Sequence, residues 1–444
     1  MSEMKFGTTG IRGDAEILFT NQFCFDIGRA FARFLKKHNK YGEVAVGMDP
    51  RESSPRIKKA IASGLIHEEF TVLNEGIVPI PAVNYILLAK PHLAGSLMIT
   101  GSHIKAHLNG VKFFAFSEEI MKDHESEIAN IYDEIKEKKA FIDISSLMED
   151  DDSALLEYQN YLIAHAANSY PNWKIVVDPG NGAQSDVISW VLKRLNLDIT
   201  EINASVQQEF YSRDTEVEGD FKELQEKVKE TKADLGVGYD SDGDRVIFVD
   251  ENGDYIYGDY SGALISREIG GNKVVTPVNS SSVVDSLGVE VFRTKVGSSQ
   301  VISKMKQKGA QIGYEANGGI IFKELMSRDG GRTTIEMLNI LNKKDQKMSE
   351  LISSLPKYYI VRDKIDYKWE LKEKIINKAK EEFKGIKTDE TDGLKIWMDE
   401  ATWILFRSSS NAPEFRVFVE SASENKAHEL LNKGLELVKE VANG

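Results

Sequence analysis

Short apolar runs alternate with longer amphipathic stretches along most of the chain. Runs rich in β-branched and aromatic residues lie at 44–47, 71–73, 95–99 and 111–114, and apolar positions recur at helical spacing over 55–65. This alternation predicts strands joined by helices, because side chains repeat every second residue in a strand and about every 3.6 residues in a helix. The pattern therefore favours an α/β architecture.

Changes in this pattern predict several domains. The acidic stretch 148–152 and the polar stretch 342–356 interrupt it, and a third change follows an acidic loop near residue 253. A chain of 444 residues also exceeds what one hydrophobic core supports. We expect three similar mixed α/β domains and a smaller α+β domain that ends in an amphipathic helix. The predicted domains are 1–150, 151–253, 254–355 and 356–444.

Charge and composition narrow the classes of partner. The formal net charge of -14 argues against nucleic acid and anionic membranes, because both would be repelled over most of the surface. No run of about 18 apolar residues occurs and the start lacks a signal-peptide pattern, so we expect a cytoplasmic protein without membrane association. The single cysteine, Cys24, excludes an internal disulfide and a multi-thiolate metal site.

An acidic loop between two apolar runs carries the strongest chemical signal. Asp240, Asp242 and Asp244 occupy alternate positions, with Arg245 directly behind them. Alternate carboxylates cannot share one helix face, whereas a tight turn between strands can direct all of them to one point. Because hard divalent cations prefer oxygen ligands, we interpret the loop as a metal site that serves a phosphate.

Two alternatives remain for this acidic loop. An EF-hand would place Glu251 at its last ligand position, but Arg245 stands where that motif needs glycine, and the flanking runs are strand-like. Solvated acids in an ordinary hairpin are the other alternative.

A second loop, residues 100–112, offers a nucleophile. Ser102 follows an apolar run, His103 is its neighbour, and Lys112 lies in the next strand-like run. A hydroxyl must be activated before it attacks, and a transferring phosphoryl group needs positive charge around its oxygens. His103 and Lys112 could supply both. A Gly-Ser turn with a structural histidine explains the same residues.

Three further loops suit phosphate or sugar groups. Arg12 lies in the glycine-rich segment 6–13, which suits an anion. Glu315 and Asn317 can accept hydrogen bonds from sugar hydroxyls and donate to them. Arg407 precedes small polar residues that fit a phosphate dianion, namely Ser409, Ser410 and Asn411. Taken singly, a terminal arm, a plain turn and a polar hairpin also account for these loops.

The order of these loops resembles the α-D-phosphohexomutase superfamily, in particular its phosphomannomutase and phosphoglucomutase members. The resemblance covers nearly the whole chain. Segments 6–13, 100–112 and 240–245 resemble the family's amino-terminal signature, phosphoserine loop and magnesium loop, and these three are specific. Segments 315–318 and 407–413 resemble its sugar-binding and phosphate-binding loops more loosely.

Three departures from the family pattern bear on function. Ile104 and Lys105 follow His103, where the family usually continues with Asn and Pro. Asn317 and Gly319 stand where many members carry a serine and then a histidine, which leaves no histidine for proton transfer there. The phosphate-binding loop lacks the common Pro, Gly, Thr and Glu but keeps side chains that form hydrogen bonds.

The resemblance implies a role for each of these residues. It implies catalytic roles for Arg12, Ser102, His103 and Lys112. It implies Mg²⁺ ligands at Ser102, Asp240, Asp242 and Asp244. It implies substrate-binding roles for Arg245, Lys295, Glu315, Asn317, Arg407, Ser409, Ser410 and Asn411.

The activity implied by the resemblance is that of a phosphohexomutase whose domains surround a central cleft. Such an enzyme interconverts hexose 1-phosphate and hexose 6-phosphate, here of mannose or glucose, through a phosphoserine and a hexose 1,6-bisphosphate that also serves as activator. We expect a phosphosugar ligand and a monomer or homodimer. Phosphoglucosamine mutase is the alternative within the family. A metal-dependent sugar phosphatase and a non-catalytic sugar-phosphate binding protein are more remote alternatives.

Overall fold

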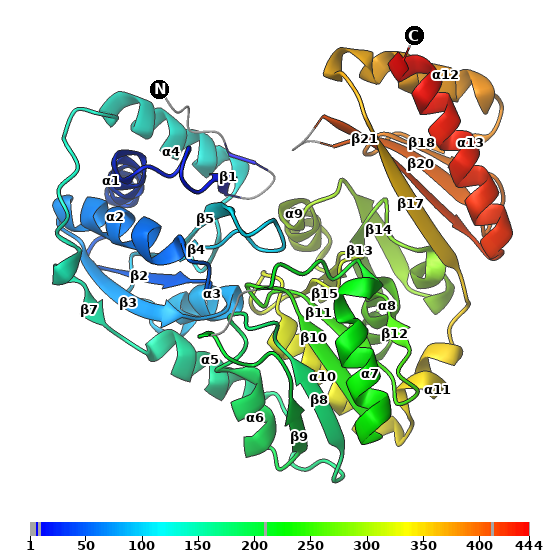
Figure 1. Ribbon diagram of the computed structural model, residues 1–444, viewed down its shortest axis with the longest axis horizontal. Coiled ribbons are helices and arrows are strands. Elements are labelled where there is room, and N and C mark those ends of the chain that lie inside the picture. The colour runs from blue at the N-terminus through cyan, green and yellow to red at the C-terminus, as the bar shows by residue number, and fades with distance from the viewer. Residues whose placement is uncertain (1–5, 8–9, 208–210, 410–412, 444) are drawn as a thin grey trace. The chain divides into compact units, whose positions relative to one another are not determined.

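The chain forms two compact units (Figure 1). The structure is a computed structural model and describes residues 6–7, 10–207, 211–409 and 413–443. Unit 1 comprises Met1–Ser261 and Asn317–Glu350, and unit 2 comprises Gly262–Ala316 and Leu351–Gly444. No helix in these described ranges is both long enough and apolar enough to cross a membrane.

The first sheet of unit 1 has seven strands, in the order β1-β5-β4-β2-β3-β7 with β6 paired to β5. Its central strands β4, β2 and β3 are parallel, β5 pairs antiparallel with β4, and β1 pairs antiparallel with β5. The strands are β1 (Ile11–Asp14), β2 (Glu43–Met48), β3 (Thr71–Ile77), β4 (Gly95–Ile99), β5 (Leu108–Ala115), β6 (Glu118–Glu119) and β7 (Glu149–Asp150). The apolar runs identified in the sequence are therefore strands, as predicted.

Helices cover this sheet and build its core (Figure 1). The helices are α1 (Asn21–Lys37), α2 (Ser54–His67), α3 (Ile80–Ala89) and α4 (Lys122–Ile135). Helix α1 begins where Thr20 accepts a hydrogen bond from the Phe23 backbone N–H, and its apolar side packs on α2 and α4. One contiguous core contains residues of α1, α2, α4 and the strands, so these elements position the loops at the strand ends.

Two glycines allow α1 and α2 to cross closely. A Cβ atom at Gly28 would lie 2.1 Å from the carbonyl oxygen of Ile61. A Cβ atom at Gly64 would likewise lie 2.1 Å from the carbonyl oxygen of Phe25. Any side chain at either position would force the helices apart, because both obstacles are backbone atoms.

The second sheet of unit 1 has five strands, in the order β12-β11-β10-β8-β9. Its strands are β8 (Lys174–Asp178), β9 (Asp198–Glu201), β10 (Leu235–Tyr239), β11 (Val246–Val249) and β12 (Tyr255–Ile256). The helices of this region are α5 (Ser153–Ala164), α6 (Ile188–Arg194), α7 (Lys222–Thr231) and α10 (Gly330–Lys344), and strand β16 (Ile320–Phe322) also lies in unit 1. Strands β10 and β11 form an antiparallel hairpin whose turn is the acidic loop.

Unit 2 contains a parallel group of strands and an antiparallel sheet. The parallel strands pair in the order β14-β13-β15 and are β13 (Lys273–Pro277), β14 (Glu290–Thr294) and β15 (Ile312–Tyr314). The associated helices are α8 (Gly258–Ile269), α9 (Ser298–Lys308) and α11 (Met348–Ser353), of which α8 and α11 begin in unit 1.

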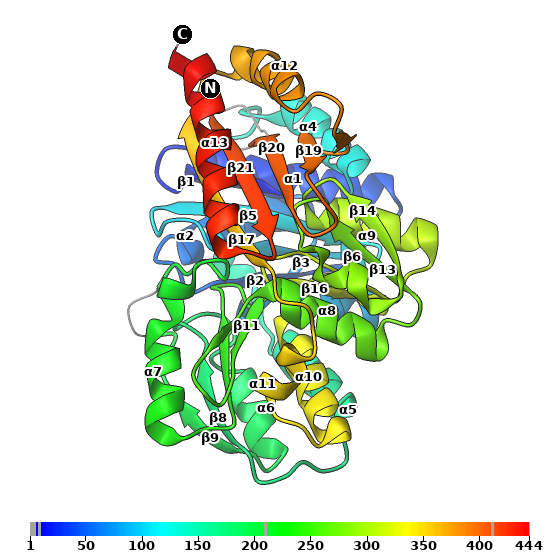
Figure 2. The same ribbon diagram turned by 90° about the vertical axis from the view of Figure 1, so that its right-hand side faces the viewer.

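The antiparallel sheet of unit 2 has five strands, in the order β17-β21-β20-β19-β18. They are β17 (Tyr359–Asp366), β18 (Lys387–Asp389), β19 (Leu394–Trp397), β20 (Trp403–Ser408) and β21 (Glu414–Ser421). Helix α13 (Glu424–Asn443) lies along one face of this sheet, and α12 (Lys372–Glu382) packs into the same core (Figure 2).

The predicted fold class is confirmed: mixed α/β layers are followed by a β-rich carboxyl-terminal sheet. The predicted domain boundaries stay a prediction. Edge strand β12 pairs with β11 and extends the second sheet to Ile256, just beyond the boundary expected at residue 253.

Replacing Gly64 with alanine is expected to lower the free energy of unfolding by about 2 kcal/mol, because the new methyl group meets the Phe25 carbonyl. This clash outweighs the gain in helix propensity, which is about 1 kcal/mol. Urea unfolding measures the difference. Gly219→Ala is the control, since a Cβ atom there meets nothing within 4 Å. Equal effects of the two substitutions would contradict the close helix crossing.

Candidate active site

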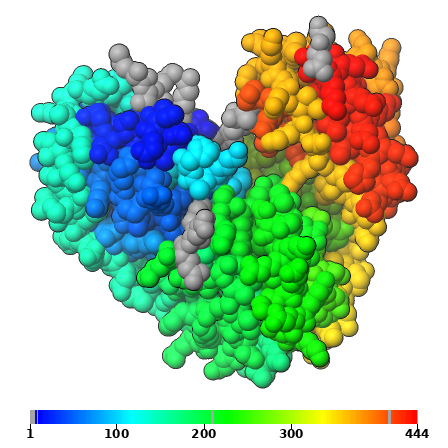
Figure 3. Space-filling model, in the orientation of Figure 1, coloured from blue at the N-terminus to red at the C-terminus, as the bar shows by residue number. Residues whose placement is uncertain are grey.

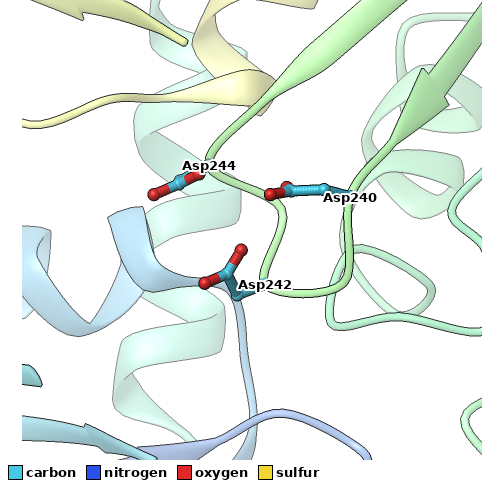
Figure 4. Close-up of side chains that lie close together, drawn as sticks. All are labelled: Asp240, Asp242 and Asp244. Carbon is cyan, nitrogen blue, oxygen red and sulfur yellow. The ribbon is translucent and has the colours of Figure 1, made fainter. Parts of the chain in front are cut away.

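The acidic loop directs three carboxylates to one point (Figure 4). Tyr239 and Val246 pair across the hairpin, and Gly243, with φ of +68°, closes the turn between them. One oxygen from each of the three aspartates lies within 4.8 Å of the others, and all three residues are buried. These are Asp240, Asp242 and Asp244.

The charges of this loop fit a divalent cation. Burial, and then the charges of Asp242 and Asp244, raise the pKa of Asp240 well above its usual range. Burial would also raise the pKa of Asp244, but the positive charges of Arg328 and Lys112 outweigh it and hold that pKa below its usual range. Among the described residues, nothing donates a hydrogen bond to Oδ1 of Asp242 or Asp244. The donor set and these two buried oxygens match the oxygen ligands that Mg²⁺ prefers.

Ser102 lies beside the acidic loop. Its Oγ is 3.3 Å from Asp240 Oδ2 and 3.3 Å from His103 Nδ1. Thr100 links the two loops, because its Oγ1 accepts from the Ser102 backbone N–H at 2.8 Å and donates to Asp242 Oδ2 at 3.1 Å. The structure therefore brings the predicted nucleophile and the predicted metal ligands together within unit 1.

The backbone of Ser102 is strained and is held from behind by Arg51. Ser102 has φ of +55°, in the left-handed region that residues other than glycine rarely adopt. The buried Arg51 guanidinium donates to Asp49 through Nε at 3.0 Å. Its Nη atoms donate to four carbonyl oxygens of the serine loop, those of Ser102, Ile104, Lys105 and Leu108. These bonds occupy the guanidinium, so Arg51 shapes the loop and is not available to a ligand.

The far part of the serine loop reaches the surface of unit 1, where the segment between β4 and β5 is visible in the space-filling view (Figure 3). Lys105 and His107 are exposed there, whereas Ser102 is buried. Ser212 and Ser241 add hydroxyl donors to the loop: Ser212 donates to the carbonyl of Ile104 at 2.7 Å and Ser241 to that of Ser102 at 2.9 Å. The reactive end of the loop is thus fixed from several sides.

Strand order gathers the cations around the acidic loop. Lys112 lies on β5, and its Nζ is 3.4 Å from Asp244 Oδ2. Arg12 lies on β1 opposite Gly110 of β5, so both cations stand beside the serine loop that follows β4. Arg245 Nε is 3.7 Å from Asp240 Oδ2. Burial, and then the charge of Arg245, lower the pKa of Arg12.

His103 is surrounded by positive charge. The guanidinium of Arg245, then burial, and then Arg12 and Arg328 hold the pKa of His103 far below its ordinary value. The imidazole is therefore neutral at pH 7. A neutral ring can accept a hydrogen bond from Ser102 Oγ at the observed 3.3 Å.

Unit 2 joins two of the predicted substrate-binding segments through Asp392. Arg407 on β20 donates through Nε to Asp392 Oδ2 at 2.8 Å. The same oxygen accepts from the Val296 backbone N–H at 3.0 Å, and Val296 follows the exposed Lys295. Asp392 therefore holds Arg407 and the Lys295 segment together.

The other predicted substrate-binding residues are distributed between the units. Glu315 is buried in unit 2 after β15, and Ser409, also in unit 2, donates from its backbone N–H to the Glu414 carbonyl at 2.8 Å. Asn317 lies in unit 1, where its Oδ1 accepts from the Gly319 backbone N–H at 3.0 Å. Ser410 and Asn411 lie outside the described residues.

Sequence reasoning missed three residues that support these side chains. They are Arg51, Arg328 and Asp392. Arg51 follows the end of β2, the strand next to β4, so its position at the carboxyl edge of a parallel sheet was a usable signal. Arg328 and Asp392 carry no comparable local signal, because each acts on a residue distant in the sequence or on another strand.

Comparisons with known proteins show which family the chain resembles. The sequence matches three alpha/beta/alpha domains described as phosphoglucomutase/phosphomannomutase: domain I over residues 3–139, domain II over 156–253 and domain III over 252–359. It is 35% identical to a phosphoglucomutase/phosphomannomutase of Thermococcus kodakarensis, covering 99% of each chain. It is 32% identical to a phosphoglucosamine/phosphogalactosamine mutase of Sulfurisphaera tokodaii, over 96% of this chain and 97% of that one.

Solved structures share the fold. A phosphoglucomutase/phosphomannomutase family protein from Burkholderia thailandensis superposes with a TM-score of 0.85 at 23% identity, covering 100% of this chain and 99% of that chain. An N-acetylphosphoglucosamine mutase of Aspergillus fumigatus, solved with GlcNAc-6P and magnesium, gives a TM-score of 0.64 at 16% identity, covering 99% and 96%.

Replacing Arg51 with lysine is expected to speed hydrogen–deuterium exchange of the amides at 102–108 at least about tenfold, because an ammonium group cannot span four carbonyl oxygens. Mass spectrometry of peptic fragments measures this. Arg29→Lys is the matched control, since Arg29 is equally buried but pairs with Asp26 and Glu68. The same exchange rate in wild type and Arg51→Lys would show that Arg51 does not hold the loop.

Proposed function

This chain belongs to the phosphoglucomutase/phosphomannomutase family, and we propose that it interconverts hexose 1-phosphate and hexose 6-phosphate through a phosphorylated Ser102. Its relatives are mutases, so the predicted enzyme class is confirmed. The observation that carries the proposal is the position of Ser102 Oγ, 3.3 Å from Asp240 in a loop of three buried carboxylates. A binding protein would need neither the hydroxyl nor the triad.

The proposed reaction consists of two phosphoryl transfers. In the first, the bond between Ser102 Oγ and phosphorus breaks, a bond from phosphorus to a sugar hydroxyl oxygen forms, and the hydroxyl proton passes to a base in the site. The product is a hexose 1,6-bisphosphate. This intermediate reorients within the site. Its other phosphoryl group then passes to Ser102 Oγ, with the bond from phosphorus to the sugar oxygen breaking, and the isomeric monophosphate leaves. The same bisphosphate would activate an enzyme that has lost its phosphoryl group.

The residues of the acidic loop would hold the metal. Asp240, Asp242 and Asp244, together with a phosphoryl oxygen on Ser102, would bind Mg²⁺. When bound, Mg²⁺ supplies neutralising charge to the phosphoryl oxygens as the P–O bond loosens. Arg245, 3.7 Å from Asp240, would support this loop and the phosphate of the substrate.

Three residues are proposed to act at the reacting oxygens. Arg12 and Lys112 would stabilise charge and assist proton transfer at the reacting oxygen, because Arg12 lies on β1 beside the serine loop and Lys112 stands at the acidic loop. The neutral His103 would orient Ser102 Oγ. Each proposed role rests on proximity and charge within unit 1.

Substrate recognition is assigned to residues remote from the reacting bond. Glu315 and Asn317 would hold the sugar hydroxyls in either orientation of the substrate. Arg407, oriented by Asp392, would grip the phosphate that is not reacting, with Lys295 as a further contact. The loop residues Ser409, Ser410 and Asn411 would complete this phosphate site. Because the substrate must bind in two orientations, it suits this reaction that the residues that bind the sugar are separate from those that transfer the phosphoryl group.

The sugar itself is proposed to be mannose or glucose. The name of the Thermococcus kodakarensis relative supports this choice. Glucosamine phosphate is the second candidate, because the Sulfurisphaera tokodaii relative is named as a phosphoglucosamine/phosphogalactosamine mutase. We also propose the four domains 1–150, 151–253, 254–355 and 356–444, and the matched family domains support the first three.

³¹P NMR tests the proposed function. The protein is incubated with Mg²⁺, a trace of hexose 1,6-bisphosphate and, in separate tubes, the 1-phosphates of mannose, glucose and glucosamine. We expect a 6-phosphate signal in wild type, none with Ser102→Ala, and wild-type behaviour with Ser126→Ala, which alters a serine on α4. The fastest tube identifies the sugar. Inorganic phosphate alone, or activity in Ser102→Ala, would refute the proposal.

Arg407→Ala is expected to raise KM for the sugar phosphate at least about tenfold, the scale of one lost charge-assisted hydrogen bond. Initial rates against substrate concentration measure KM. Arg416→Ala is the matched control, because Arg416 is its register partner on β21 and pairs with Glu414 instead. A KM unchanged in Arg407→Ala would exclude Arg407 from the phosphate site.

A further inference from the structure

We propose that Arg328, which occupies space left open by Gly319, is a positioning residue that fixes Asp244 for metal binding. The inference deepens the proposed function and rests on it, because it concerns the same acidic loop. Arg328 is buried, and its Nη2 donates to Asp244 Oδ2 at 2.6 Å. This contact is shorter than those that Lys112 and Arg245 make with Asp244, at 3.4 Å and 3.8 Å.

Gly319 makes room for the Arg328 stem. A Cβ atom at Gly319 would lie 2.4 Å from Arg328 Cδ and 3.1 Å from its Cγ, much closer to the Cδ than to the next neighbour, Asn317 Oδ1 at 3.0 Å. The backbone beside Gly319 is fixed, because the Val246 N–H donates to the Gly318 carbonyl at 3.3 Å and a Cβ atom at Gly318 would meet the Val246 carbonyl oxygen at 2.2 Å. A side chain at position 319 would therefore displace Arg328 and not the loop. The glycine that departs from the family pattern thus admits the arginine.

The backbone of Arg328 is held as firmly as its side chain. Arg328 forms an antiparallel bridge with Ile321, and the next residue, Asp329, donates from its N–H to the Ile320 carbonyl at 2.9 Å. Asp329 also caps α10 by accepting from the Arg332 N–H at 2.8 Å. The helix start touches the acidic loop, since a Cβ atom at Gly330 would lie 2.8 Å from the Gly243 carbonyl oxygen. Arg328 therefore approaches Asp244 from a rigid support.

The contact with Arg328 gives the two carboxylate oxygens of Asp244 different partners. Oδ2 accepts from Arg328 and Lys112, whereas Oδ1 accepts no hydrogen bond from any described residue and has Arg245 Nε at 3.8 Å. The carboxylate is thereby oriented with one oxygen left for the cation, as expected of a ligand held by an outer partner. Arg328 is a cation and would act on the metal through Asp244, so its role is positioning.

Mn²⁺ binding measured by EPR on the dephosphorylated protein tests this role. Loss of orientation is expected to weaken Mn²⁺ binding at least about tenfold in Arg328→Ala, the usual effect of removing an outer partner. Loss of one positive charge alone would instead tighten binding, because the triad would attract the cation more strongly. The sign of the change therefore separates positioning from simple electrostatics, and unchanged or tighter binding overturns the inference.

Two further variants keep the test sharp. Gly319→Ala retains the charge but displaces the Arg328 stem, so it is expected to weaken Mn²⁺ binding in wild type and to have little further effect in Arg328→Ala. Independent, additive effects of the two substitutions would overturn the pairing of Gly319 with Arg328. Arg332→Ala is the matched control, because Arg332 is also buried but pairs with Glu336, and it should leave Mn²⁺ binding within about twofold.

The proposed function and this inference fail differently. If wild type neither binds Mn²⁺ nor converts any sugar phosphate, the proposed function falls and the inference with it. If wild type does both and Arg328→Ala binds Mn²⁺ as tightly as wild type, only the inference falls. With both intact, we expect kcat of Arg328→Ala to fall at least about tenfold and KM to stay within about threefold, because a residue that acts through Asp244 alters the metal site and not the residues proposed to bind the sugar.

Discussion

Mutual repulsion among three buried carboxylates is the constraint on which the active site depends. One oxygen from each lies within 4.8 Å of the others, in an interior where like charges interact strongly. The fold meets this with cations from separate segments: Lys112 from β5, Arg245 from the loop itself and Arg328 from the segment before α10. A divalent cation would supply the rest. Unit 1 therefore has to gather distant parts of the chain before the site exists.

Backbone strain at Ser102 is the second constraint. Hydrogen bonds to the backbone carbonyls of its loop hold this conformation. A left-handed serine is costly by roughly 1–3 kcal/mol and persists only where its surroundings determine it. Arg51 stabilises this conformation by donating hydrogen bonds to the carbonyls of Ser102 and Ile104. Asp49 in turn fixes the guanidinium by accepting from its Nε. Phosphoryl transfer gains from such preorganisation, since a nucleophile held in place loses little freedom in the transition state. The two loops meet through Thr100 and Asp242.

Local pattern made much of the fold and part of the site predictable. The apolar runs are strands buried on both faces, and such a run is recognisable from a few neighbouring residues. The acidic hairpin was predictable for the same reason, because its signal lies in adjacent residues. Edge strand β12 was not predicted, because it forms by pairing with β11 and its own sequence is too short to indicate a strand. The role of Arg328 was not predictable from the sequence, because its partner Asp244 is 84 residues away. The reason for a glycine at position 319, the close approach of the Arg328 side chain, is likewise visible only in the folded chain. The roles of Ser410, Asn411 and the domain boundaries stay predictions.

Location of the phosphoryl group is the most direct test of the central claim, that Ser102 carries it beside the aspartate triad. The protein is incubated with hexose 1,6-bisphosphate and Mg²⁺, digested, and its peptides are sequenced by tandem mass spectrometry. The account predicts phosphate on Ser102, absent when Mg²⁺ is removed by a chelator before the incubation. Phosphate on His103 or on another residue, or none under any condition, would contradict it.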